Sequence, residues 1–130
     1  MSAPSLQARQ KLAALQYSYV CNLPGKLGAI MHEFDRLRTD ADAPQALGEL
    51  HKLTHQLAGS AGSFGCRDIS VAAREYDAFL SQLDPSHSPN RTDMRTLEIL
   101  FEQLQHVIDS TVATTLHAAT DTTDKPNREV

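Results

Sequence analysis

The apolar residues of this 130-residue chain recur at steps of three and four, which is the spacing that buries one face of an α-helix. No stretch alternates apolar and polar residues with the β-branched enrichment of a strand. The chain is therefore expected to be all-α. The pattern predicts helices over about 5–20, from Asn22 to the stretch "RTDADAP", from Pro44 to Gly65, over about 68–83 and over about 92–118.

The apolar stripes of the last four helices define the expected core, and the N-terminal helix adds Leu12, Leu15 and Tyr19 on one side. Short connections make neighbouring helices antiparallel. We expect an up-and-down antiparallel four-helix bundle with an extra N-terminal helix capping one end. This single domain covers 1–118, and a frayed polar tail covers 119–130. The stripes are Leu23, Leu27, Ile30, Phe34 and Leu37; Leu47, Leu50, Thr54, Leu57, Ala61 and Phe64; Ile69, Ala72, Tyr76, Phe79 and Leu83; and Leu97, Phe101, Leu104, Ile108 and Thr111.

Composition narrows the functional classes. The apolar share of 41% and the charged share of 22% are typical of a soluble globular protein. A formal net charge of -4 without a basic stripe argues against nucleic-acid binding. No apolar run approaches the roughly 20 residues that span a membrane, and the N-terminus does not resemble a signal peptide. We therefore expect a cytoplasmic protein, and no nucleotide-binding motif is present.

One exposed strip of the third helix is unusual. On a helical wheel of about 100° per residue, His55 points roughly 140° from Leu50 and roughly 160° from Leu57, away from the core. Each glycine inside a helix costs roughly 0.5–1 kcal/mol relative to alanine, and core packing does not require glycine on an outer face. A strip without side chains would let another protein approach the imidazole closely. The strip consists of Gly48, Lys52, His55, Gly59 and Gly62.

The stretch "HQLAGSAGSFG" resembles the signature of histidine-containing phosphotransfer (HPt) domains, roughly H-x-[LI]-[KA]-G-[SAG]-[SAG]-x-x-[FLV]-G. The resemblance implies a monomeric four-helix bundle that relays phosphoryl groups in two-component signalling. It implies that His55 accepts the phosphoryl group, that Gly59 gives the partner access, and that Phe64 and Gly65 close the helical hairpin. Ala58 departs from the family pattern, because lysine often stands at this position to meet the phosphate.

The resemblance also implies the partners. A sensor hybrid histidine kinase and a response regulator would each present a receiver domain, which supplies an acidic pocket, the phospho-accepting aspartate and Mg²⁺. This chain would bind no cofactor of its own. It has no ATP-binding motif and no H-E-x-x-P pattern, so it should not phosphorylate itself. We expect Lys52, Gln56, a serine hydroxyl or groups of the partner itself to replace the missing lysine, with Lys52 preferred. The expected partner surface contains His51, Ala58, Gly62 and Ser63.

The hairpin between the third and fourth helices predicts a partner for the histidine. His55 lies eleven positions before Cys66 and Asp77 lies eleven positions after it, so antiparallel helices should bring the two level. Asp77 would then accept a hydrogen bond from Nδ1–H of His55 and leave Nε2 to carry the phosphate. The alternative is an ordinary solvated aspartate.

Two other functions are compatible with the sequence. The first is a non-catalytic helical bundle that binds receiver or kinase domains without phosphoryl chemistry. The alanine at position 58 leaves this alternative open, and the presence of His55 argues against it. The second is a metal site, because His51 and His55 are spaced as a pair that can share a metal ion. The segment "HKLTH" has lysine where the H-E-x-x-H motif needs its general base, and no third ligand is evident nearby. We therefore predict no metal site.

Overall fold

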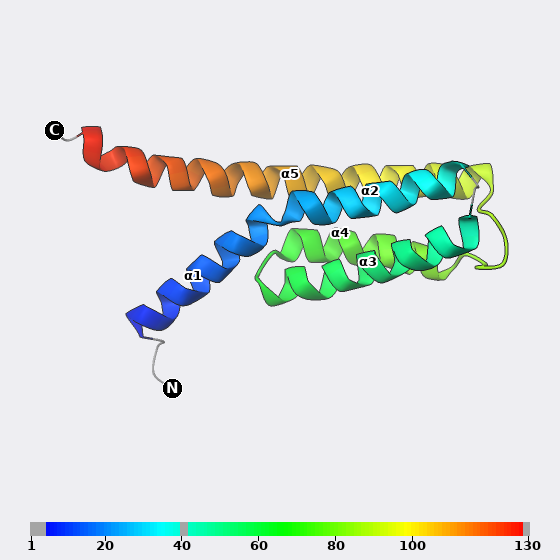
Figure 1. Cartoon of the computed structure of the whole chain (residues 1–130), viewed down its shortest axis with the longest axis horizontal. Helices are drawn as coiled ribbons and strands as arrows, with labels where there is room; N and C mark the ends of the chain where they lie inside the picture. The colour runs from blue at the N-terminus through cyan, green and yellow to red at the C-terminus, as the bar shows by residue number, and fades with distance from the viewer. Residues whose placement is uncertain (1–4, 40–41, 129–130) are drawn as a thin grey trace.

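The computed structural model describes the backbone of residues 5–39 and 42–128, with side chains up to residue 118. Figure 1 shows α2 to α5 side by side with alternating directions, while α1 leaves the bundle at an angle. An all-α helical bundle is thus confirmed. None of the described helices is both long and apolar enough to cross a membrane. Within the described ranges the regular elements are α1 (Leu6–Cys21), α2 (Leu23–Thr39), α3 (Ala43–Ser63), α4 (Arg67–Ser81) and α5 (Arg91–Arg128).

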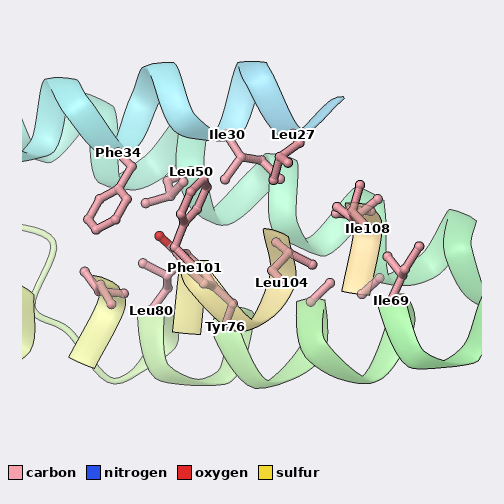
Figure 2. Close-up of a cluster of buried hydrophobic side chains, with 14 of the residues drawn as sticks. Leu27, Ile30, Phe34, Leu50, Ile69, Tyr76, Leu80, Phe101, Leu104 and Ile108 are labelled. Atoms are coloured by element: carbon pink, nitrogen blue, oxygen red, sulfur yellow. The ribbon is translucent and has the colours of Figure 1, made fainter. Parts of the chain in front are cut away.

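The core lies where α2, α3, α4 and α5 meet, and Figure 2 shows its centre. Most of the predicted stripe residues are buried there, as the helical period requires. The buried polar residue Thr54 satisfies its hydroxyl by donating to the backbone oxygen of His51 at 3.1 Å. The predicted core residues that are buried are Leu23, Leu27, Ile30, Phe34, Leu37, Leu47, Leu50, Thr54, Leu57, Ala61, Ile69, Tyr76, Leu97, Phe101, Leu104 and Ile108.

The buried face of α4 is turned from the predicted one. Ala72, Phe79 and Leu83 are only half-buried, whereas Ala73 and Leu80 are buried. Tyr76 belongs to two sets of residues at helical spacing, one with Ala72, Phe79 and Leu83 and the other with Ala73 and Leu80. Both sets fit the apolar pattern of the sequence. Because α4 packs against both α3 and α5, the set that contains Ala73 is the buried one. The small side chain of Ala73 allows α4 to approach its neighbours closely.

The α3–α4 hairpin ends α3 by a Schellman motif. The amide of Cys66 donates to the carbonyl of Ala61 at 2.8 Å, and the amide of Gly65 donates to that of Gly62 at 3.2 Å. Gly65 has φ of 78°, a left-handed conformation that glycine adopts without steric cost. The predicted stop at Gly65 is therefore confirmed, and the turn fixes how α4 is aligned with α3.

The two terminal helices differ from expectation. Only the C-terminal end of α1 is packed: the Tyr19 ring stacks on Phe64 at 4.5 Å, and Gln16 donates to the Phe64 carbonyl at 3.1 Å. Leu12 and Leu15, predicted to face inward, are exposed because α1 diverges from the bundle. The helix α5 continues to Arg128, where we expected a frayed tail from 119. Residues 129 and 130 of that tail lie outside the described residues.

An aromatic cluster at the centre of the core contains an unpaired hydroxyl. The ring of Tyr76 packs edge-on against Phe34 at 6.5 Å between centroids. The Tyr76 hydroxyl is buried and has no hydrogen-bond partner among the described residues. Burial also raises the pKa of Tyr76 above its ordinary value of 10.0, because the tyrosinate would lose its hydration.

Tyr76→Phe is expected to preserve or raise the stability of the protein at pH 7, by up to about 1 kcal/mol, because it removes a polar group with no partner. Because the pKa of Tyr76 is raised in the folded state, the unfolded chain loses this proton first as pH rises. Wild-type stability should therefore fall above about pH 10, and the variant should lose less. Urea unfolding at pH 7 and near pH 10.5 measures both effects. A variant clearly less stable at pH 7 would mean that the hydroxyl has a partner.

Candidate functional site

His55 stands on the outer face of α3 with its side chain 74% exposed. Gly59 lies one turn further along the helix, and a Cβ atom added there would meet nothing within 4 Å. Lys52 and Gln56 are exposed on the same part of α3. The imidazole is therefore reached from solvent across a surface that carries no side chain at Gly59.

Asp77, on α4, lies beside this histidine. Its Oδ2 is 3.4 Å from Nδ1 of His55, and its side chain is only 19% exposed. The Gly65 turn brings the two residues level, at the offset that the hairpin geometry predicts. A carboxylate oxygen can only accept a hydrogen bond, so this contact requires the hydrogen on Nδ1 and leaves a lone pair on Nε2 of the neutral ring.

His51 lies next to the same carboxylate from one turn earlier in α3. Its Nε2 is 2.8 Å from Oγ of Ser81 and 3.3 Å from Oδ1 of Asp77. The rings of His51 and His55 are nearly parallel, at 3° and with centroids 6.5 Å apart. Sequence reasoning missed Ser81, although a signal was available, because His51 and Ser81 each lie fifteen positions from Cys66.

The expectation that Ala58 belongs to the partner surface was wrong. Ala58 is only 5% exposed, because it faces α4, where the Ser70 hydroxyl donates to its carbonyl at 2.8 Å. Gly62 is exposed, but a Cβ added there would lie 3.4 Å from Oγ of Ser70. Ser63 is exposed, and its hydroxyl donates to the carbonyl of Gly59 at 3.2 Å. The accessible small-residue surface therefore consists of Gly59, Gly62 and Ser63.

A groove of about 540 Å³ lies between α3 and the region where α1 meets α2. Gln56 and Ser60 line one side of it, and Lys26 contributes a cation. The Lys26 Nζ is 5.7 Å from the centroid of the Tyr19 ring, and the Tyr19 hydroxyl is 2.6 Å from Oγ of Ser60. The groove thus combines aromatic, amide and cationic groups, and it reaches α3 at Gln56 and Ser60.

In the part of the chain that the structure describes, no three His, Cys, Asp or Glu side chains are placed to hold a metal ion. The polar groups around His55 instead contact one another, with hydrogen bonds from His55 to Asp77 and between His51 and Ser81. The arrangement presents one exposed, oriented imidazole, which is suited to act as a nucleophile toward a group brought by another molecule.

Comparison with known proteins agrees with this geometry. No curated protein and no solved structure matches the chain. The family model of the Hpt domain matches residues 25–107, which run from the first turn of α2 into α5 and include both His55 and Asp77. This match covers well over half of the 130 residues and confirms the resemblance carried by the segment from His55 to Gly65. The chain therefore belongs to the Hpt domain family.

Proposed function

We propose that His55 accepts a phosphoryl group from the aspartyl phosphate of a receiver domain in a hybrid kinase and passes it to the aspartate of a response regulator. Membership of the Hpt family points to phosphotransfer in two-component signalling. The observation that carries the proposal is the exposed imidazole of His55, whose Nδ1 faces Asp77 and whose Nε2 is left for chemistry. The protein would act in the cytoplasm as a monomer, without binding nucleic acid or membranes.

The proposed reaction is a reversible in-line displacement at phosphorus. Nε2 of His55 attacks the aspartyl phosphate, an N–P bond forms, and the O–P bond to the receiver breaks with release of its carboxylate. The hydrogen on Nδ1 stays in place, and the carboxylate of Asp77 balances the positive charge that develops on the ring. Mg²⁺ held by the receiver would neutralise phosphoryl oxygens, and this chain would need no cofactor.

Charge near the phosphoryl group would come from Lys52. Ala58 stands three positions after His55, where the family often has lysine, and position 58 is buried against α4. Lys52 is exposed one turn before His55, so its flexible side chain is free to turn toward the phosphate. Gln56, the residue after His55, adds an exposed amide that would donate a hydrogen bond to a phosphoryl oxygen.

The receiver would dock over Gly59, Gly62 and Ser63 and extend toward the groove that contains Lys26. A cation in this groove complements the acidic pocket that a receiver presents around its aspartate. His51 borders the same surface with 43% of its side chain exposed. The contact would be small and transient, as relay between two successive partners requires.

The direct test is transfer of labelled phosphate from a phosphorylated receiver of the same cell, with Mg²⁺ present. We expect label on this protein that is labile in acid and stable in alkali, as phosphohistidine is. Phosphorus NMR of the product should place the phosphoryl group on Nε2. Absence of label with several receivers that nevertheless bind would overturn the proposal and favour a non-catalytic interaction bundle.

Gly59→Gln is expected to slow transfer from the receiver by about tenfold, because its side chain would fill the approach to His55. The same change should stabilise the isolated protein by about 0.5–1 kcal/mol, since glutamine is a better helix former than glycine. Transfer rates and urea unfolding measure the two effects. Gly28→Gln is the matched control, because its Cβ also enters open space, on α2 rather than on the strip of α3 around His55. Equal slowing by both variants would contradict the assignment of Gly59 to the approach path.

A further inference from the structure

The carboxylate of Asp77 faces two histidines rather than one. Its Oδ2 is 3.4 Å from Nδ1 of His55, and its Oδ1 is 3.3 Å from Nε2 of His51. Oδ1 is buried and makes no hydrogen bond among the described residues, and Nε2 of His51 is the nitrogen that lies beside it. One imidazole thus faces each oxygen of the carboxylate.

The hydrogen bonds around Ser81 determine which nitrogen of His51 carries a hydrogen. The Ser81 hydroxyl donates its only hydrogen to the backbone oxygen of Asp77 at 2.9 Å. At 2.8 Å from Nε2 of His51, the same Oγ must therefore accept, and Nε2 must be the donor. The same nitrogen lies 3.3 Å from Oδ1 of Asp77, so the N–H of His51 is directed to Ser81 while the ring edge that carries it lies against the carboxylate.

We propose that His51 is a positioning residue for phosphotransfer: by donating from Nε2 to Ser81 and facing Oδ1 of Asp77, it holds that carboxylate so that Oδ2 keeps the hydrogen of His55 on Nδ1. The inference rests on the proposed function of His55. It gives His51 a role distinct from that of a second phosphate carrier. Its Nε2 is occupied within the protein and its side chain is 43% exposed, against 74% for His55.

Without His51, the carboxylate of Asp77 would lose the ring that lies beside Oδ1. A buried carboxylate oxygen left in this state turns toward water when its side chain is able to rotate. The contact between Oδ2 and Nδ1 of His55 is already long at 3.4 Å, so a small rotation would break it. His55 would then populate the tautomer with hydrogen on Nε2, which cannot attack phosphorus from that atom.

The test compares His51→Asn with His51→Gln in the full chain. The amide nitrogen of glutamine reaches about as far as Nε2 of histidine, whereas that of asparagine reaches only as far as Nδ1. Nitrogen-15 NMR of the histidine rings reports the tautomer of His55 without any partner present. We expect His51→Asn to reduce the Nδ1–H tautomer of His55 and to slow transfer from a phosphorylated receiver about tenfold. His51→Gln should restore both values to within about threefold of the wild type.

His106→Asn is the matched control, because it makes the same change at an exposed histidine on α5. An unchanged His55 tautomer and transfer rate in His51→Asn would overturn the inference. Equal losses in the Asn and Gln variants would also overturn it, because they would show that the ring packing of His51 matters rather than its donor. If wild-type protein takes no label from any receiver, the proposed function fails, and the tautomer measurement still decides whether His51 positions Asp77.

Discussion

His55→Gln is expected to reduce phosphoryl acceptance from a receiver to background. Glutamine has a comparable size and polarity, but its amide nitrogen carries no lone pair that can attack phosphorus. The change should leave the fold intact, because the His55 side chain is 74% exposed and its hydrogen-bond contact to Asp77 is long. Surface changes of this kind usually alter stability by less than about 0.5 kcal/mol. The measurement is the yield of acid-labile label after incubation with a phosphorylated receiver and Mg²⁺.

Two controls make this result specific to His55. His106→Gln replaces another exposed histidine, on α5, and should accept label like the wild type. Binding of the receiver to His55→Gln should persist, because the docking surface over Gly59 and Ser63 is unchanged. Label that survived in His55→Gln would show that another residue carries the phosphoryl group, and His51 would be the first to examine.

Phe34→Ala should destabilise the bundle by about 3–5 kcal/mol, the usual cost of removing a fully buried phenylalanine. Phe34 is 1% exposed, and its ring contacts Tyr76 of α4 and Phe101 of α5, with the Phe101 ring centroid 5.6 Å away. The Phe34 side chain thus connects α2 to α4 and α5. Its removal would leave a cavity where these three helices meet. Because domains of this size are stable by only about 5–15 kcal/mol, the loss would be a large part of the total.

Urea unfolding followed by circular dichroism measures the effect of Phe34→Ala. Met31→Ala is the matched control on the same helix, since Met31 is 39% exposed, and its loss should stay below about 1 kcal/mol. If the folded fraction of Phe34→Ala still accepts phosphate at the wild-type rate, core and site act independently. A loss no larger than that of the control would contradict the packing described around Phe34.

The helices of the bundle could be predicted from sequence because their buried residues recur every three or four positions, which is the period of an α-helix and not of a β-strand. The stripes of α2 and α5 correspond to buried residues from Leu23 to Leu37 and from Leu97 to Ile108. The buried face of α4 could not be predicted, because two lines through Tyr76 have the same spacing and only the neighbouring helices distinguish them. The exposure of Leu12 and Leu15 likewise depends on the direction in which α1 leaves the bundle, which its local sequence does not encode.

At the candidate site, sequence reasoning worked where the geometry depends on one turn. The hairpin at Gly65 relates positions in α3 to positions in α4, and it brought His55 and Asp77 to 3.4 Å. The same relation would have indicated Ser81 opposite His51. Ala58 was misplaced because it follows His55 by one turn, although on a wheel of about 100° per residue it lies only about 20° from the buried Leu47. The position faces α4, which the composition of α3 alone does not reveal.

The Schellman turn at Gly65 also makes the site depend on the number of residues between His55 and Asp77. His55 and Asp77 are separated by 22 positions, and the whole interval is helix apart from that short turn. Inserting one residue between Gly65 and Asp77 would shift α4 by about 1.5 Å along its axis and rotate the carboxylate by about 100° away from the imidazole. The helices would still form and the histidine would still be exposed, but it would have no acid beside it. In this protein the interval between the two residues is therefore as much a part of the site as their chemical identity.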